Sequence, residues 1–325
     1  MSATELVCRV SNLVGRSPGA RLAASTLVTA FRSLHVAESF VQSATAAIAD
    51  GGRAGTLPVA VTLPNGAPLL IVCDLRYEAC RQVALRPGSL ERNPELRLFS
   101  VLAARSRLVI DAGANAGFFS YVAAAASPDV RVIAIEPIPA LAALLRDNAA
   151  ANRLAGRIDV HELLISDGIG TGRLFIARSD SESTMQPERA ARQVVRRSLD
   201  LPTCTLDALL DDAAAEPSAT LIKIDVEGHE RQAIGGLART LGSGQRPELF
   251  VEFLGDALSA GIIEQTIARG YDVYYVCGER LLLLGSTSAF LAHQNLNYWN
   301  FLCSVRSRET VRDDGESAGL EVLTA

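Results

Sequence analysis

Hydrophobic and polar positions follow two different periods in the middle of this chain. Short apolar runs with strand character are separated by segments whose apolar residues recur at helical spacing. Strands are predicted at residues 107–110, 130–135, 158–165, 220–224 and 248–253, and helices at 118–126, 140–151, 206–210, 230–241 and 258–269. Strands that alternate with helices at this spacing are typical of βαβ units. The pattern therefore predicts an α/β fold with a mostly parallel, Rossmann-like sheet and helices on both faces.

The two ends of the chain follow other patterns. Helical spacing predicts helices over 21–50 and 93–104, and β-like runs around a Pro-Asn-Gly turn predict a hairpin over 59–72. A second hairpin is predicted where residues 273–276 and 281–284 flank Gly278. We expect an N-terminal helical and hairpin extension over 1–100, the main domain over 101–306, and a polar tail over 307–325 that is disordered.

Composition narrows the possible partners and compartments. At 325 residues and 49% hydrophobic content the chain can form a sizeable core, and no apolar run is long enough to span a membrane. Glu5 and Arg9 interrupt any secretory pattern at the start, so we expect a cytoplasmic protein with no membrane partner. A net charge of −5 gives nucleic acid no electrostatic attraction. The six cysteines are widely scattered, without the close pairs of a zinc or thiol-exchange site.

The segment VIDAGANAG at 109–117 places glycines between a predicted strand and a predicted helix. Such a loop lies at the carboxyl end of a parallel strand, where open α/β sheets bind ligands. A dinucleotide pyrophosphate requires a Gly-rich turn without a nearby anion, but Asp111 precedes the first glycine and Asn115 replaces the second. S-adenosylmethionine has no phosphate and carries a sulfonium and an ammonium group. A carboxylate ~4 Å from such a cation gains about 4 kcal/mol before desolvation at an effective dielectric near 20. The loop thus favours S-adenosylmethionine.

Acidic residues also end the next two predicted strands. Glu136, followed by Pro137, can accept both hydroxyls of a ribose, and Ser166 with Asp167 can border an adenine ring. Each has a simpler interpretation, as a turn former or a solvated strand end. The three acidic strand ends together favour a nucleoside cofactor.

Three segments resemble the FkbM-type branch of the class I S-adenosylmethionine-dependent methyltransferases. They are VIDAGANAGFFS at 109–120, IEP at 135–137 and LIKIDVEGHE at 221–230, and the last is the most specific. The resemblance covers roughly residues 95–253. It implies a seven-stranded sheet with an antiparallel final strand, and methyl transfer to an oxygen of a small molecule or sugar. It also implies positions for the cofactor: the loop of Asp111, Gly113, Ala114, Asn115 and Gly117 for the methionine part, Glu136 and Pro137 for the ribose, and Ser166 and Asp167 for the adenine.

Methyl transfer to a hydroxyl requires alignment of the reactants and removal of a proton. Lys223 and Asp225 share one face of the fourth predicted strand, and Asp225 lies where that strand ends beside the cofactor. Glu227 and His229 follow, and the pKa of a histidine suits proton removal near neutrality. Asp225, Glu227 and His229 are therefore the candidate catalytic residues. The alternative is an acidic cluster that merely starts a helix and favours its dipole.

Two further patterns carry less specific chemistry. Asp225, Glu227 and His229 could ligate a metal, but such a loop is common without one, and we expect no required metal. Arg189, Arg192, Arg196 and Arg197 form a basic stripe at helical spacing, either a solvated face or a site for an anionic substrate group.

The sequence leaves three functional hypotheses. The first is a methyltransferase that acts on a hydroxyl of a small molecule or sugar, and the second is a nicotinamide-dependent oxidoreductase on a similar sheet. The third is a non-catalytic protein that has kept the methyltransferase fold, because fold alone does not fix function. Asp111 and Asn115 disfavour the second hypothesis.

Overall fold

A computed structural model describes residues 55–86, 88–177, 183–192, 194–253, 257–293 and 299–324. Residue contacts divide the chain into two compact units. The first comprises residues 1–62 and 68–90, and the second comprises 63–67 and 91–325. The helix expected over 21–50 lies outside the described residues.

The described part of the first unit is a hairpin with helices. Strands β1 (Thr56–Thr62) and β2 (Pro68–Asp74) pair antiparallel, and α4 (Glu78–Leu85) packs on β2. Alternate β1 side chains are buried, as expected for a strand with one covered face. The hairpin prediction is confirmed. The expected boundary at residue 100 falls inside helix α6 (Pro94–Ala104), which belongs to the second unit.

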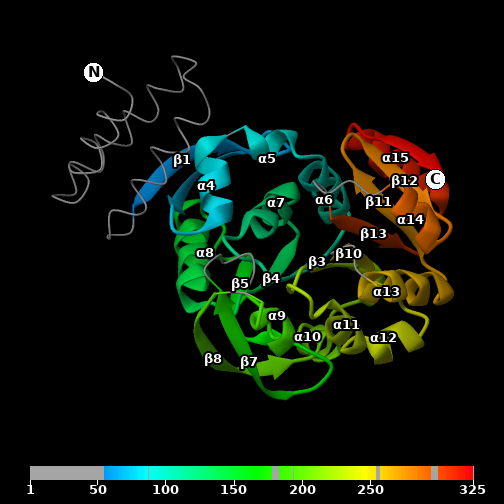
Figure 1. The fold of residues 1–325 in the computed structure, drawn as a ribbon. Coiled ribbons are helices and arrows are strands. Elements are labelled where there is room, and N and C mark those ends of the chain that lie inside the picture. Colours follow the sequence, from blue (N-terminus) through cyan, green and yellow to red (C-terminus); the bar gives the residue numbers. More distant parts are fainter. Residues whose placement is uncertain are drawn as a thin grey trace. The chain divides into compact units, whose positions relative to one another are not determined.

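The second unit is built on a large sheet (Figure 1), which has nine strands within the described ranges. Its order is β14-β12-β11-β13-β10-β9-β3-β4-β5. The strands are β3 (Leu108–Ala112), β4 (Arg131–Ile135), β5 (Ile158–His161), β9 (Thr220–Ile224), β10 (Glu248–Glu252), β11 (Asp272–Cys277), β12 (Arg280–Leu284), β13 (Asn300–Ser304) and β14 (Glu321–Thr324). Strands β5, β4, β3, β9 and β10 pair in parallel, and β13 pairs antiparallel with β10 and β11. The predicted α/β class with a mostly parallel sheet is confirmed.

Helices cover both faces of this sheet, as expected for buried parallel strands. One face packs against α6 and α7 (Phe118–Ala126), where the rings of Phe99 and Phe119 contact that of Phe250 on β10. The other face shares one apolar core with α10 (Leu206–Asp212), α11 (Glu230–Gly235), α12 (Ala238–Gly242), α13 (Ala257–Ala268) and α14 (Thr287–His293). Two of these helices have side-chain N-caps, since Asn93 accepts from Leu96 N and Thr205 accepts from Ala208 N.

Two features at the C-terminal end differ from the expectation. The sheet continues past the seven expected strands, because β12 extends the β11 edge and β14 pairs in parallel with β12. Residues 307–325 were expected to be a disordered tail, and this was wrong: α15 (Arg308–Ser317) and β14 form there. The Ser307 side chain caps α15 by accepting from Thr310 N, Val311 is fully buried, and the buried Asp314 pairs with Arg105 and Arg306. Figure 1 shows α15 with β11 and β12 at one end of the sheet.

Two predicted elements are each divided in two. The strand expected over 158–165 is β5 in the large sheet and β6 (Leu164–Ile165) in a separate sheet with β8 (Val195–Cys204) and β7 (Gly170–Ala177). The helix expected over 230–241 breaks into α11 and α12 at Gly235 and Gly236. A Cβ on Gly236 would lie 2.3 Å from the Ser166 carbonyl oxygen, so the helix break brings the backbone close to the 166–167 loop. Within the described ranges, no helix combines the length and the apolar composition needed to cross a bilayer.

Candidate active site

The candidate residues gather where the parallel strands end. Asp111 lies near the end of β3, Glu136 follows β4, Asp225 follows β9, and Glu252 is the last residue of β10. Because β4, β3, β9 and β10 are neighbours and run the same way, their carboxyl ends meet at one edge of the sheet. This edge positions the site.

The glycine loop after β3 approaches the end of β9 closely. Gly113 has a φ of +83°, and a Cβ there would lie 1.7 Å from the backbone oxygen of Asp225. Gly117, with a φ of +89°, directly precedes α7, and its Cβ would lie 2.6 Å from Leu145 Cγ. Asn115, between them, also has a positive φ of 50°, a conformation that asparagine tolerates better than most residues. Only glycine at 113 allows the loop and Asp225 to meet.

The backbone N–H groups of this loop are already used inside the protein. Gly113 N and Ala114 N both donate to Ile135 O, at 3.0 and 2.9 Å, and Asn115 N donates to Glu136 Oε2 at 2.7 Å. Ala116 N donates to the side-chain oxygen of Asn115 at 2.7 Å, and Gly117 N donates to Ala114 O at 2.8 Å. A phosphate-binding loop instead directs such N–H groups at its ligand. The loop lacks the donors that a pyrophosphate needs.

Glu136 is buried and fixed by two backbone groups. Its Oε2 accepts from Asn115 N and its Oε1 accepts from Ile138 N at 2.8 Å. Each carboxylate oxygen can accept more than one hydrogen bond, so the group keeps capacity for the hydroxyls of a ribose. Pro137 lies between Glu136 and Ile138 in the chain, and helix α8 (Pro139–Ala151) begins directly after Ile138.

Asp111 is not an exposed charge of the loop. It is fully buried, accepts a 2.6 Å hydrogen bond from Ser120 Oγ, and has Oδ1 3.7 Å from Lys223 Nζ. Burial raises the pKa of Asp111, and Lys223 and Ser120 oppose that shift. Lys223 also bonds Asp225 Oδ2 at 2.9 Å, as the shared strand face predicted. From the sequence, Asp111 was expected to attract a cationic cofactor. Because Lys223 opposes the charge of Asp111, any such attraction must come from the acidic residues of the site together.

Three carboxylates converge beside Lys223. One oxygen from each of Asp225, Glu227 and Glu252 lies within 4.8 Å of the others, and these three are the carboxylate cluster. Burial and the neighbouring charge of Asp225 raise the pKa of Glu227 to about 9. The same two causes raise the pKa of Glu252 well above its usual value. The cluster can hold and exchange protons, and its oxygens could also ligate a divalent ion.

The sequence reasoning missed Glu252. The available signal was its position, because an acidic residue at the carboxyl end of the fifth parallel strand lies at the same edge as the other candidates. The sequence grouped His229 with Asp225 and Glu227. Among the described residues, however, His229 does not belong to the carboxylate cluster.

His229 instead lies beside Ser166 and Asp167, the residues predicted to border the adenine. Its Nε2 is 3.1 Å from Ser166 Oγ, and the same hydroxyl lies 3.3 Å from Asp167 Oδ1. Burial lowers the pKa of His229 and Asp167 partly offsets the effect, so the ring is neutral near pH 7. Its Nδ1 is buried and has no hydrogen-bond partner among the described residues. The structure thus brings His229 together with Ser166 and Asp167.

A loop after β7 clamps the turn that carries Glu227. Thr184 Oγ1 donates to Glu227 O at 2.8 Å, Gln186 Nε2 donates to Gly228 O, and Arg189 Nη2 lies 3.7 Å from Glu227 Oε2. Glu227 itself has a φ of +52°, which costs about 1–2 kcal/mol for a residue with a Cβ. The clamp stabilises this conformation and so positions the Glu227 carboxylate.

The expected basic stripe does not form. Arg189 lies in the short helix α9 (Pro187–Ala190), whereas Arg196 and Arg197 are exposed on β8, which pairs with β7. Strand pairing replaces the helical spacing that would have aligned them. Arg189 alone reaches the site.

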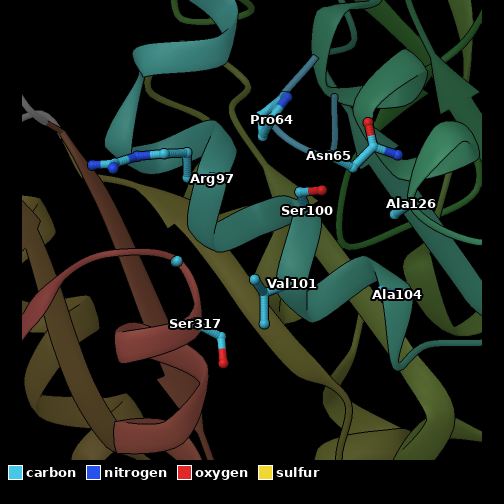
Figure 2. A pocket seen from close by; sticks show the side chains of 9 residues that line it. Pro64, Asn65, Arg97, Ser100, Val101, Ala104, Ala126 and Ser317 are labelled. Carbon is cyan, nitrogen blue, oxygen red and sulfur yellow. The ribbon is translucent and has the colours of Figure 1, made fainter. Parts of the chain in front are cut away.

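A separate cavity of about 290 Å³ lies away from these residues (Figure 2). It is lined by the turn at Pro64 and Asn65, by α6 and by residues 317–318. Its charged residue, Arg97, is paired with Glu279. None of the predicted site residues lines it, so the reaction is not assigned to this cavity.

Known proteins share sequence with this part of the chain. Residues 111–273 match the family described as methyltransferase FkbM domain. The chain is 34% identical over 204 residues to the 31-O-demethyl-FK506 methyltransferase FkbM of Streptomyces tacrolimicus, a match that covers 54% of this chain and 74% of that protein.

Solved structures are similar to this chain at lower identity. A precorrin-6y C5,15-methyltransferase from Geobacter metallireducens is 14% identical, with a TM-score of 0.37, over 65% of this chain and 88% of that chain. An O-methyltransferase from Bacillus cereus, in complex with SAH, is 14% identical with a TM-score of 0.35 over 65% of this chain and 78% of that chain. These TM-scores are below 0.5, so the family assignment depends on the two sequence matches.

Proposed function

Because the chain belongs to the FkbM methyltransferase family, we propose that it moves a methyl group from S-adenosylmethionine to a hydroxyl oxygen of a small molecule or sugar. The family makes it a methyltransferase. The geometry at the carboxyl edge of the sheet supports the choice of cofactor and of catalytic residues.

The observation that carries the cofactor proposal is the state of the glycine loop. Its five backbone N–H groups, from Gly113 to Gly117, donate to acceptors within the protein. A dinucleotide would have to replace those bonds to seat its pyrophosphate, whereas S-adenosylmethionine has no phosphate. The loop backbone would hold the methionine part next to Asp225, and Glu136 would accept from the ribose hydroxyls.

The adenine would lie against Ser166 and Asp167. The Asp167 carboxylate can accept from an exocyclic amino group, and the Ser166 hydroxyl can donate to a ring nitrogen. His229 Nε2 already contacts Ser166 Oγ, so we place His229 on the cofactor side and give it a lower rank as the base.

The carboxylate cluster supplies the proton acceptor. When bound, S-adenosylmethionine provides an electrophilic methyl carbon on a cationic sulfur. With the cofactor bound, a carboxylate of Asp225, Glu227 or Glu252 would accept the proton that the acceptor hydroxyl loses when its oxygen is methylated. Burial and the charge of Asp225 raise the pKa of Glu227 to about 9 and that of Glu252 well above its usual value, so a proton that reaches either group is held there.

The direct test is a transfer assay with labelled S-adenosylmethionine and a panel of sugars and hydroxylated small molecules. The methylated atom is then located by mass spectrometry. We expect label on oxygen in at least one acceptor. Transfer to nitrogen or carbon alone, across a panel that offers all three, would refute the proposed reaction.

The residue assignment has its own test. Glu252→Gln should lower kcat by about 100-fold or more, the usual effect of losing a general base, while S-adenosylmethionine still binds. Glu316→Gln, which removes an exposed carboxylate on α15, is the matched control and should leave kcat unchanged. A kcat for Glu252→Gln within threefold of the control, ~0.7 kcal/mol in barrier height, would remove Glu252 from the proposed machinery.

A further inference from the structure

Lys223 is the chain's single lysine, and it lies in the centre of the large sheet. It is 1% exposed, and on the strands beside β9 its partners are Asp111 in β3 and Phe250 in β10. A buried ammonium group is costly unless charges of opposite sign surround it. A lysine at this position therefore requires an electrostatic explanation, which the methyl-transfer step does not supply.

The ammonium group connects the cofactor loop to the carboxylate cluster. Nζ lies 2.9 Å from Asp225 Oδ2, 3.7 Å from Asp111 Oδ1 and 4.7 Å from the centre of the Phe119 ring. Burial would lower the pKa of Lys223, but Asp225 and Asp111 outweigh burial and raise it above its usual value. Lys223 is thus a permanent cation between two acidic residues.

The Lys223 ammonium group forms ion pairs with two carboxylates, Asp111 and Asp225, at the border of the carboxylate cluster. Asp111 is fully buried, and its Oδ1 has no hydrogen-bond partner among the described residues, so Lys223 is its compensating charge. The Asp225 side chain is 28% exposed and faces the site. A ligand near these groups is affected by their net charge. Removing the charge of Lys223 makes that net charge more negative by one unit, and removing the charge of Asp111 or Asp225 makes it more positive by one unit.

The proposed cofactor and the product that it leaves after methyl transfer differ by one unit of charge. S-adenosylmethionine carries a positive sulfur, and S-adenosylhomocysteine carries a neutral one, while the rest of the two molecules is shared. At an effective dielectric near 20, one unit charge ~8 Å away changes an affinity by more than tenfold. The charge balance around Lys223 therefore acts on the ratio of the two affinities more than on either affinity alone.

We propose that Lys223 is a positioning residue that balances Asp111 and Asp225, and so limits how strongly the site prefers the cationic methyl donor over the neutral product. This inference rests on the proposed function, because it takes S-adenosylmethionine as the cofactor. Its consequence is that Lys223 sets the degree of inhibition by the product.

The test compares the Kd values of S-adenosylmethionine and S-adenosylhomocysteine by calorimetry on the full chain. Lys223→Met keeps most of the side-chain volume and removes the charge, and it should increase the preference for S-adenosylmethionine by about tenfold or more, equivalent to ~1.4 kcal/mol. The double variant Lys223→Met with Asp111→Asn restores the balance, and its ratio should return to within about threefold of the wild type. Arg308→Gln removes one exposed positive charge at the opposite end of the strands, beside Asp272, and should leave the ratio unchanged.

A second variant protects the test against misfolding. If Lys223→Met does not fold, Asp225→Asn removes one negative charge at a partly exposed position and should lower the preference for S-adenosylmethionine by about tenfold. A purely structural role for Lys223 would weaken both ligands equally, so an unchanged ratio in every folded charge variant overturns the inference. A wild-type protein that binds neither nucleoside overturns the proposed function as well, which separates the two failures.

Discussion

Gly113 offers a quantitative test of the close approach between the glycine loop after β3 and the end of β9. In Gly113→Ala, a residue with a Cβ must adopt a φ of +83°, which costs about 1–2 kcal/mol. The new Cβ would also lie 1.7 Å from the Asp225 carbonyl oxygen, and such backbone overlap adds about 1–3 kcal/mol. The variant should lose about 2–5 kcal/mol of unfolding free energy and most of its affinity for S-adenosylmethionine.

Gly244→Ala is the matched control. Gly244 has a φ of +82° and nothing within 4 Å of a Cβ, so only the conformational cost of about 1–2 kcal/mol applies. Urea unfolding followed by circular dichroism measures both variants, and equal m-values are required for the comparison. Equal losses of unfolding free energy in the two variants would refute the close approach as the reason for glycine at 113.

Three further predictions concern the rest of the chain. Glu227 has a pKa of about 9 in the folded protein, above its unfolded value, so its contribution to stability is present at low pH and is lost as the pH rises toward 9. Unfolding free energies between about pH 5 and pH 9 should therefore fall more steeply for the wild type than for Glu227→Gln, and equal slopes would contradict the raised pKa. Deleting residues 307–325 should cost about 3 kcal/mol or more in thermal or urea unfolding, because the protein loses the burial of Val311 and Leu320 and the pairing of β14 with β12, whereas a disordered tail would cost almost nothing. Activity should be unchanged in a chelator, as the sequence predicts no required metal; loss of activity that a divalent ion restores would contradict this and direct attention to the carboxylate cluster.

Local sequence signals predicted the elements around the site well. The hairpin turn and the alternation of strands and helices depend on residues close together in the chain, so they can be read without knowing the fold. The shared face of Lys223 and Asp225 follows from strand alternation alone, and their 2.9 Å bond confirms it.

Features that depend on strand order could not be predicted in the same way. Asp111 and Lys223 are 112 positions apart in the numbering and meet only because β3 lies beside β9. Glu252 joins the cluster only because β10 is the next strand, and α15 is stabilised by ion pairs to residues outside the tail. The prediction of a basic stripe was wrong for the same reason, because the arginines at 196 and 197 lie on strand β8, which pairs with β7, and not on a helix.

The central claim is that the carboxyl edge of this sheet binds a cationic nucleoside without phosphate. Titration calorimetry of the wild-type chain with S-adenosylmethionine and, separately, with NAD tests it most directly. The account predicts a saturable binding isotherm for S-adenosylmethionine and none for NAD at the same concentrations. Tight binding of NAD together with no binding of S-adenosylmethionine would contradict it.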